Sequence, residues 1–172
     1  MFEGFSPETV DFLWGIRMNN NREWFMAHKP DYVQKLYEPM KALGWELFQP
    51  FIDCPGEIYK VSRIYRDARL HHPLPYKESL WICIRPEGEW WGDIPCLYFE
   101  INPEGVDYGF FFWKPRPAMM REFRKRIADK PEAFLRMISR VEKDTGVPVA
   151  AVPYKHPAPC PDPRLERFYL WK

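Results

Sequence analysis

The sequence has little glycine and much proline, with 9 glycines against 19 prolines in 172 residues. It contains no P-loop, no glycine-rich dinucleotide-binding motif, no nucleophile elbow and no HExxH motif. No enzyme class that is recognised by these motifs is therefore indicated. The many prolines predict rigid connections and frequent ends of helices and strands.

Long hydrophobic runs and an excess of one charge are also missing. Apolar stretches such as "GFFFW" are far too short to cross a bilayer, and the opening "MFEGFSPETV" lacks the apolar stretch of a secretory signal. Lys plus Arg number 25 and Asp plus Glu number 24, so the net charge of +1 provides no overall attraction to nucleic acids or membranes. We therefore expect a cytoplasmic protein with no membrane partner.

The few cysteines are widely spaced, and no two of them form a C-x-x-C pair: Cys54, Cys83, Cys96 and Cys160. This spacing argues against a structural zinc site and predicts free, buried thiols in a reducing compartment. His71 and His72 are adjacent, so their side chains diverge on a strand and lie about 100° apart on a helix, which seldom allows both to bind one ion. We expect neither a metal site nor a cofactor.

Hydrophobic residues make up 46% of the chain and the charges nearly cancel, which predicts a folded protein rather than a disordered one. A first helix should begin in "SPETVDFLWGI", with Ser6 as its cap and Pro7 in its first turn. Asn20 and Glu23 have the spacing of a capping box for a second helix.

The hydrophobic period changes along the chain. Between residues 30 and 50, apolar side chains recur every three or four positions, which predicts an amphipathic helix that Pro39 kinks or divides in two. Leu80, Ile82 and Ile84 instead alternate with their neighbours, which predicts a strand. The segments "CLYFEIN" and "VDYGFFFW" are predicted to form two more strands.

The predicted strands are joined by good turn sequences, "RPEGE" and "NPEGV", in which proline and glycine suit a type I turn. The "EWWGDIP" segment should add a short strand or a loop. The simplest arrangement is one antiparallel meander of about four or five strands with helices packed on one face. The sequence therefore predicts an α+β fold.

Two further helices are predicted in "PAMMREFRKRIADK" and "PEAFLRMISRVEKDTG", and Gly146 should end the second one. The rest of the chain is rich in proline and is expected to lie over the surface. We predict a single domain, residues 1–172, made of N-terminal helices (6–52), a sheet (58–113), C-terminal helices (116–146) and a proline-rich tail (147–172).

Basic residues are concentrated in the stretch "RIYRDARLHHPLPYK", which holds Arg63, Arg66, Arg69 and Lys77 with the carboxylate Asp67 among them. Alternating charges and β-branched or aromatic residues favour an extended segment, in which Arg63, Asp67 and Arg69 share one face and Arg66 lies on the other. A helical turn would instead align the three arginines. Guanidinium groups match carboxylate and phosphate oxygens, so the segment is a candidate anion clamp. The alternative is structural: Asp67 pairs with an arginine and the other cations hold helix ends.

Neighbouring residues extend this hypothesis. Tyr76 could donate its hydroxyl group or stack on a ligand, and Asn21 and Arg22 of "NNNREWF" could face the same pocket. We expect a cytosolic domain that binds a small anionic ligand, a phosphate or a carboxylate. One alternative is an enzyme that acts on a phosphorylated or carboxylated metabolite, with Asp67 or Glu23 as the acid–base group.

A third alternative is a protein-interaction module that uses exposed aromatic residues and the basic helix in "KPRPAMMREFRKR". Such a helix can grip nucleic-acid phosphates. Its charges also fit the solvated side of an ordinary amphipathic helix, however, and we do not expect nucleic acid as a partner. The sequence indicates no oligomeric state.

Several motifs, taken in order, resemble a bacterial family known as domain of unknown function 2461: "FEGFSPETVDFLWGIRMNNNREWFMAHKPDY", "SRIYRDAR", "PYK" and "FEINPEGVDYGFFFWKPRP". The resemblance runs from Phe2 through the helix after Pro117 and implies no established activity. The chain departs from the family pattern in two places. The loop "LHHPL" is usually longer in the family, and "FFFW" stands where the family usually has glycines. The family pattern also leads us to expect a further helical segment after residue 172. The hallmark positions that the resemblance implies are Asn20, Asn21, Arg22, Glu23, Trp24, Arg63, Arg66, Asp67, Arg69, Pro75, Tyr76 and Lys77.

Overall fold

The structure is a computed structural model that describes residues 1–67, 69, 73–88, 90–155 and 159–171, apart from the side chain of Trp91. The chain divides into two compact units, residues 1–113 and residues 114–172. Hydrophobic residues form a separate core in each unit. The single domain expected from the sequence stays a prediction, to be tested by the way in which the two cores unfold.

The first unit begins with helices: α1 (Pro7–Met18), α2 (Arg22–Ala27), α3 (Lys29–Asp31), the π-helical segment η1 (Tyr32–Tyr37), α4 (Glu38–Phe48) and the 3-10 turn η2 (Gln49–Phe51). α1 begins after Ser6, as predicted, because Ser6 has the extended backbone of an N-cap. The predicted capping box is wrong. Asn21 and not Asn20 caps α2, since the Asn21 Oδ1 atom accepts the N–H of Trp24 over 2.9 Å.

Pro39 is accommodated by a change of helix type. The chain is helical from Lys29 to Phe48, and π-helical turns give way to α4 at Glu38, one residue before Pro39. A proline has no N–H to donate, and it is tolerated in the first turn of an α-helix but not in the interior. The new start at Glu38 therefore places Pro39 where the missing donor costs little.

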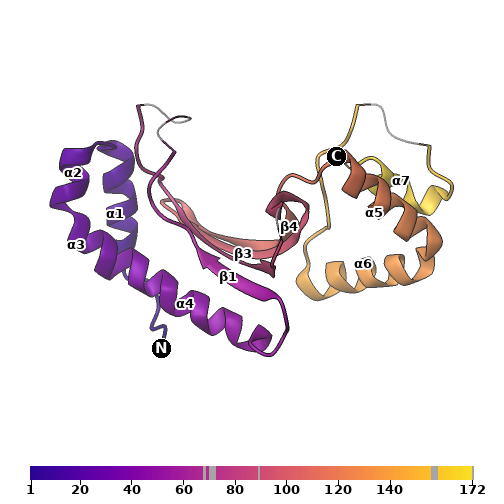
Figure 1. Cartoon of the computed structure of the whole chain (residues 1–172), viewed down its shortest axis with the longest axis horizontal. Coiled ribbons are helices and arrows are strands. Elements are labelled where there is room, and N and C mark those ends of the chain that lie inside the picture. Colours follow the sequence, from indigo (N-terminus) through magenta and orange to yellow (C-terminus); the bar gives the residue numbers. More distant parts are fainter. Residues whose placement is uncertain (68, 70–72, 89, 156–158, 172) are drawn as a thin grey trace. The chain divides into compact units, whose positions relative to one another are not determined.

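The sheet consists of β1 (Glu57–Val61), β2 (Leu80–Pro86), β3 (Pro95–Asn102) and β4 (Gly105–Phe112). The strands follow one another in the order β1-β2-β3-β4, each antiparallel to the next (Figure 1). This arrangement confirms the predicted α+β fold with an antiparallel meander. "EWWGDIP" forms the 3-10 turn η3 (Trp91–Asp93) before β3 and adds no separate strand among its described residues.

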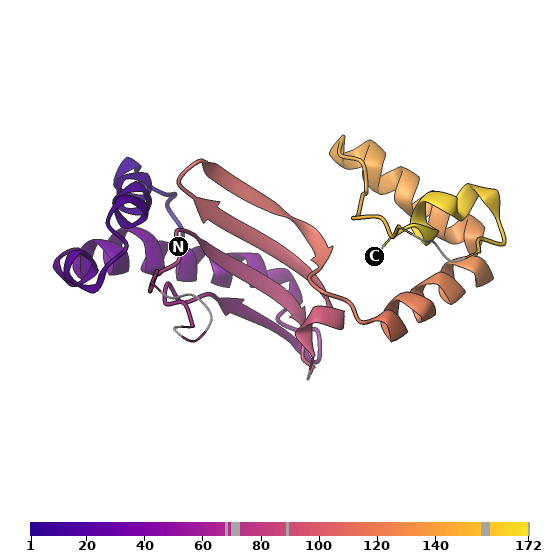
Figure 2. The same ribbon diagram turned by 90° about the horizontal axis from the view of Figure 1, so that it is seen from above.

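The helices of the first unit pack on one face of the sheet, as Figures 1 and 2 show. Leu80 and Ile82 of β2 point to this face and are buried in the core. α4 approaches β1 closely, because a Cβ atom at Gly44 would lie only 3.3 Å from the side chains of Tyr59 and Val61. The opposite face of the sheet carries Trp81 and Cys83 of β2 and their partners Glu100 and Tyr98 of β3.

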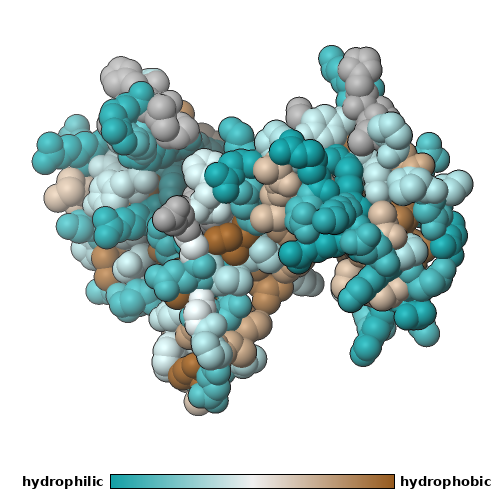
Figure 3. Space-filling view, turned by 45° about the vertical axis from the view of Figure 1, so that its right-hand side comes forward, coloured by the Kyte–Doolittle hydropathy of each residue, from teal (hydrophilic) through white to brown (hydrophobic). Residues whose placement is uncertain are grey.

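β4 is an edge strand that exposes apolar side chains. Val106, Tyr108, Phe110 and Phe112 alternate along β4 and are 52%, 77%, 63% and 40% exposed. We call these four residues the β4 row. Figure 3 shows hydrophobic side chains at the surface interspersed with hydrophilic ones. An exposed apolar edge of this length is unusual, because edge strands are templates for pairing with other chains.

Cys83 and Cys96 form a disulfide between β2 and β3, so the prediction that all four cysteines are free is wrong for this pair. The strand register explains the contact: Cys83 lies opposite Tyr98, two residues from Cys96 and on the same face of the sheet. Such a pairing depends on the register and cannot be read from a separation of 13 residues alone. Cys54 and Cys160 are free.

The second unit consists of α5 (Pro117–Asp129), α6 (Pro131–Thr145), the 3-10 turn η4 (Pro163–Leu165) and α7 (Glu166–Tyr169). Gly146 ends α6 with a left-handed φ of 69°, as predicted. The expectation that the tail lies over the surface is wrong for its last part. η4 and α7 contribute three of the five buried residues of the second core, which are Ile127, Ile138, Leu165, Phe168 and Tyr169.

Candidate functional site

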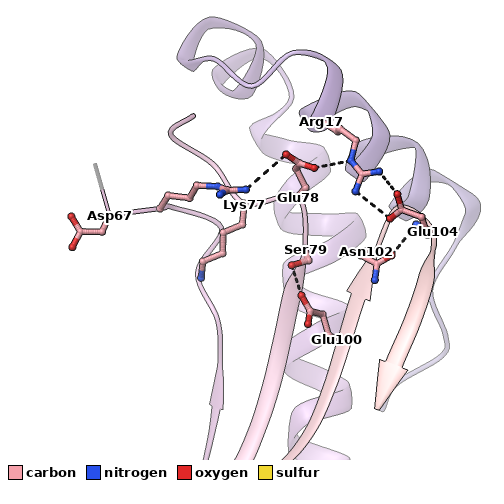
Figure 4. Close-up of a pocket in the computed structure, with 9 residues that line it drawn as sticks. Arg17, Asp67, Lys77, Glu78, Ser79, Glu100, Asn102 and Glu104 are labelled. Atoms are coloured by element: carbon pink, nitrogen blue, oxygen red, sulfur yellow. Dashed lines mark hydrogen bonds and ion pairs between the residues drawn. The ribbon is translucent and has the colours of Figure 1, made fainter. Parts of the chain in front are cut away.

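A polar cleft of about 510 Å³ lies in the first unit, beside the ends of β2 and β3 and the C-terminal turn of α1 (Figure 4). Every described residue that lines it has a charged or polar side chain. The residues that line it are Arg17, Arg66, Asp67, Lys77, Glu78, Ser79, Glu100, Asn102 and Glu104. Arg66, Asp67 and Lys77 were candidate residues from the sequence, and the other six were not.

The segment that carries the predicted cations is extended after β1. Tyr65 pairs with Tyr76 as an antiparallel bridge, the N–H of Arg66 donates to Pro75 O over 2.9 Å, and the N–H of Lys77 donates to Ile64 O over 2.7 Å. These contacts exclude the alternative of a helical turn. As alternation predicts, Ile64 is buried and Arg66 half-buried, whereas Arg63, Tyr65 and Asp67 are exposed.

The backbone of Tyr76 joins this segment to the loop before α2. Asn20 exchanges two hydrogen bonds of 3.0 Å with it, donating from Nδ2 to Tyr76 O and accepting the Tyr76 N–H at Oδ1. Arg66 donates from Nε to the same carbonyl over 2.6 Å. One carbonyl therefore links the two sequence elements that mark the family resemblance.

Arg17 connects three parts of the cleft. Its Nε donates to Glu78 over 2.7 Å, and its Nη atoms donate to Glu104 of the β3–β4 turn. Glu78 also lies 3.8 Å from Arg66 Nη2. The hydrogen bonds to Glu104 and Glu78 raise the pKa of Arg17, and the same contact with Arg17 lowers the pKa of Glu104. A row of alternating charges, Glu104–Arg17–Glu78–Arg66, thus runs across the cleft, and Figure 4 labels the first three of these residues.

Lys77 differs from these residues because it forms no ion pair with any residue that the structure describes. Its Nζ donates to the carbonyl of Arg63 over 2.8 Å and lies 5.6 Å from the centre of the Trp81 ring. Burial lowers the pKa of Lys77, and the charges of Lys60 and Arg66 lower it further, against a smaller opposite effect of Glu100. An anion beside Lys77 would relieve this repulsion.

The remaining predicted cations do not join Lys77 and Arg66 in the cleft. Arg63 is exposed and contributes only its carbonyl. Arg69 is 87% exposed and pairs with Asp67, with Nη2 and Oδ2 2.6 Å apart, which raises the pKa of Arg69. Asp67 lines the cleft, but its carboxylate points away from the other groups drawn in Figure 4. This ion pair is the one that the structural alternative predicted, in which Asp67 pairs with an arginine.

The other candidates lie outside the walls of the cleft. Tyr76 is buried and stacks on Phe25 with ring centres 4.3 Å apart, and burial raises the pKa of its hydroxyl. Asn21 caps α2, and Arg22 and Glu23 are exposed in the first turn of that helix. The suggested His71 and His72 lie outside the described residues.

Six cleft residues were missed by the sequence analysis. Three of them, Glu100, Asn102 and Glu104, lie in "FEINPEGV", which was noted as a family motif but interpreted only as a strand and a turn. The spacing of two between Glu100 and Asn102 was the available signal, because it places both side chains on one face of the end of β3. The contacts of Arg17 span 61 and 87 residues and have no local signal.

The described residues contain no group of three or more His, Cys, Asp and Glu side chains placed to hold a metal ion. Likewise, in the part of the chain that the structure describes, no helix has the length and apolar character needed to cross a membrane.

Comparison with known proteins returned one family and no individual relative. No curated protein and no solved structure matches the chain. A family model described as a conserved hypothetical protein, DUF2461, matches residues 8–161. This range covers most of the chain and includes every residue of the cleft. The protein therefore belongs to the DUF2461 family.

Proposed function

We propose that the protein binds a small carboxylate or phosphate anion in the cleft, between Lys77 and Arg66. The observation that carries this proposal is the state of Lys77, a half-buried ammonium group that two other cations repel and that has no carboxylate partner among the described residues. The proposal keeps Lys77 and Arg66 from the candidates in the sequence. It leaves out Arg63, Arg69, Tyr76, Asn21 and Arg22, whose side chains lie elsewhere.

The donors that such an anion needs are present. An ammonium group has three donors, and Lys77 uses one of them for the Arg63 carbonyl. A guanidinium group has five, and Arg66 uses Nε for the Tyr76 carbonyl. Charge-assisted hydrogen bonds from these two groups would hold an anion more strongly than neutral donors could.

A thermal-shift titration with acetate and with inorganic phosphate tests the proposal. A ligand that binds only the folded state at 100 times its Kd adds about 2.7 kcal/mol to the free energy of unfolding, so the wild-type midpoint should rise. Lys77→Met should abolish the rise. Lys41→Met, which removes an exposed lysine of α4, should leave it unchanged. The proposal is wrong if neither anion moves the wild-type midpoint, or if Lys77→Met responds like the wild type.

The enzyme alternative has less support, because its two acid–base candidates are badly positioned. Glu23 does not line the cleft, and Asp67 points away from the other groups there and pairs with Arg69.

A protein-interaction role is the second candidate, and the exposed β4 row favours it. If β4 is a contact surface, replacing Phe110 by lysine should abolish an association that sedimentation velocity detects in the wild type. A wild-type protein that remains monomeric at every concentration, and shows no partner-dependent protection of β4, would remove this candidate.

We also propose that the protein is cytoplasmic. The balanced charge and the lack of a membrane-spanning helix in the described residues support this location. Fractionation of cells that express the protein tests this location. The protein should be recovered in the cytosolic fraction, and recovery in the secreted or the membrane fraction would contradict the proposal.

A further inference from the structure

The charges of the cleft are not those of a simple anion site. Among the residues that the structure describes, four carboxylates line it against three cations. Three of the carboxylates have cationic partners. Arg17 forms ion pairs with Glu78 and Glu104, and Arg69 forms one with Asp67. With Arg69 counted, four cations balance these four carboxylates, so the described residues provide no excess of positive charge for a ligand with two or more negative charges.

Glu100 differs from the other three carboxylates of the cleft because it forms no ion pair with a described residue. Its Oε1 accepts a hydrogen bond of 2.5 Å from the hydroxyl of Ser79, and Oε2 accepts none from the described residues. No cation in the described part of the chain is close enough to Glu100 to form an ion pair. Within the described part of the chain, the cleft thus contains one carboxylate and one ammonium group, Glu100 and Lys77, that form no ion pair.

Both groups adjoin the same aromatic side chain. Lys77 Nζ lies 5.6 Å from the centre of the Trp81 ring, and Glu100 is the direct cross-strand partner of Trp81. Lys77 and Glu100 do not form an ion pair with each other, although they face one cleft. A ligand that carries both an anionic and a cationic group could complement both residues at once.

We propose that the ligand of the cleft is a small amino acid, with its carboxylate at Lys77 and Arg66 and its ammonium group at Glu100. This inference rests on the proposed anion site and narrows its ligand. The hydrogen bond from Ser79 holds Glu100 in position and leaves its second oxygen for the ligand. An ammonium group supplies three donors, which suits a carboxylate with a free oxygen.

Isothermal titration calorimetry with matched pairs of ligands tests the inference. Glycine, β-alanine and γ-aminobutyrate are compared with acetate, propionate and butyrate at one pH and ionic strength. A charge-assisted hydrogen bond is worth enough for at least one amino acid to bind about tenfold or more tightly than its matched carboxylate. The best chain length then reports the distance between the two charged groups.

Two comparisons assign this advantage to Glu100. Glu100→Gln keeps an acceptor for Ser79 and should remove the advantage of the amino acid, so that each amino acid and its matched carboxylate bind this variant with about equal affinity. Glu38→Gln, on the surface of α4, should change neither affinity. If Glu100→Gln fails to fold, N-acetylglycine tests the wild type instead: its neutral amide should bind no better than acetate.

The possible results separate the two proposals. If carboxylates bind and amino acids bind no more tightly, the amino-acid inference is wrong and the anion site stands. If the advantage survives in Glu100→Gln, the ammonium group is held elsewhere and the assignment fails. If neither class of ligand binds, the anion site itself is wrong, and the inference is wrong with it.

Discussion

Asn20 and Tyr76, 56 residues apart in the sequence, exchange two hydrogen bonds of 3.0 Å between the side-chain amide of the first and the backbone of the second. Both groups are partly buried, so water cannot freely replace either bond. The bridge holds the loop before α2 against the segment that carries Arg66 and Lys77. Its loss should therefore affect both the stability of the first unit and the shape of the cleft.

Asn20→Ala should lower the free energy of unfolding by about 1–3 kcal/mol, since it leaves a backbone N–H unpaired and removes one of two donors to a carbonyl. Chemical denaturation measures this loss. Gln34→Ala, at an exposed position among the helices, is the control and should change stability by less than about 0.5 kcal/mol. Equal stabilities of the two variants would show that the bridge is not structural.

Glu78→Gln should destabilise the protein by about 1–2 kcal/mol, because Glu78 accepts a hydrogen bond from Arg17, also forms an ion pair with Arg66, and has only 27% of its side chain exposed. Asp144→Asn breaks an exposed pair with Arg140 on α6 and should cost about 0.5 kcal/mol or less. Denaturation at low and high salt measures both. A loss at Glu78 that vanishes completely in high salt would contradict a partly buried contact.

Ionisation of the Tyr32 hydroxyl should lower the free energy of unfolding in strong alkali. Burial raises the pKa of its hydroxyl from 10.0 to about 12. Below pH 10 the group is neutral in both states; as the pH rises towards 12, only the unfolded chain loses the proton, so the free energy of unfolding falls, by roughly 2 kcal/mol in total.

Tyr32→Phe should remove this part of the alkaline loss, measured as unfolding free energy at several pH values. Tyr108→Phe is the matched control, because Tyr108 is 77% exposed, and should keep the wild-type pH dependence. A Tyr32→Phe profile parallel to that of the wild type would contradict the assignment.

The two cores should respond separately to truncation. Leu13→Ala in the first core and Phe168→Ala in the second should each cost about 2–5 kcal/mol, because both side chains are fully buried. Hydrogen exchange followed by mass spectrometry should then show faster exchange mainly in the unit that carries the substitution. Equal acceleration in both units would instead support the single cooperative domain expected from the sequence.

Local signals were sufficient for most of the fold. Ser6 before Pro7 marked the start of α1, Gly146 marked the end of α6, and the alternation of Leu80 and Ile82 marked β2. Each of these signals depends on residues a few positions apart, so the interactions that produce it are local and can be read from the sequence.

Errors arose where distant residues compete for a side chain. Asn20 fits a capping box by spacing, but the backbone of Tyr76 offers it two bonds in place of one, and Asn21 caps the helix instead. The site shows the same limit. Alternation correctly separated Arg66 from Arg63, whereas the contribution of Arg17 to the cleft depends on contacts with Glu78 and Glu104, far along the chain.

Arg66 makes a structural contact and a cleft contact with different atoms, so evolution should retain it for two separate reasons. Its Nε holds the Tyr76 carbonyl, while its Nη atoms face Glu78 and the cleft. A lineage that stopped using the cleft would still need the Nε bond to hold the loop. Arginine at this position should thus persist through loss of the ligand, and Lys77 and Glu100 should be the residues that drift first.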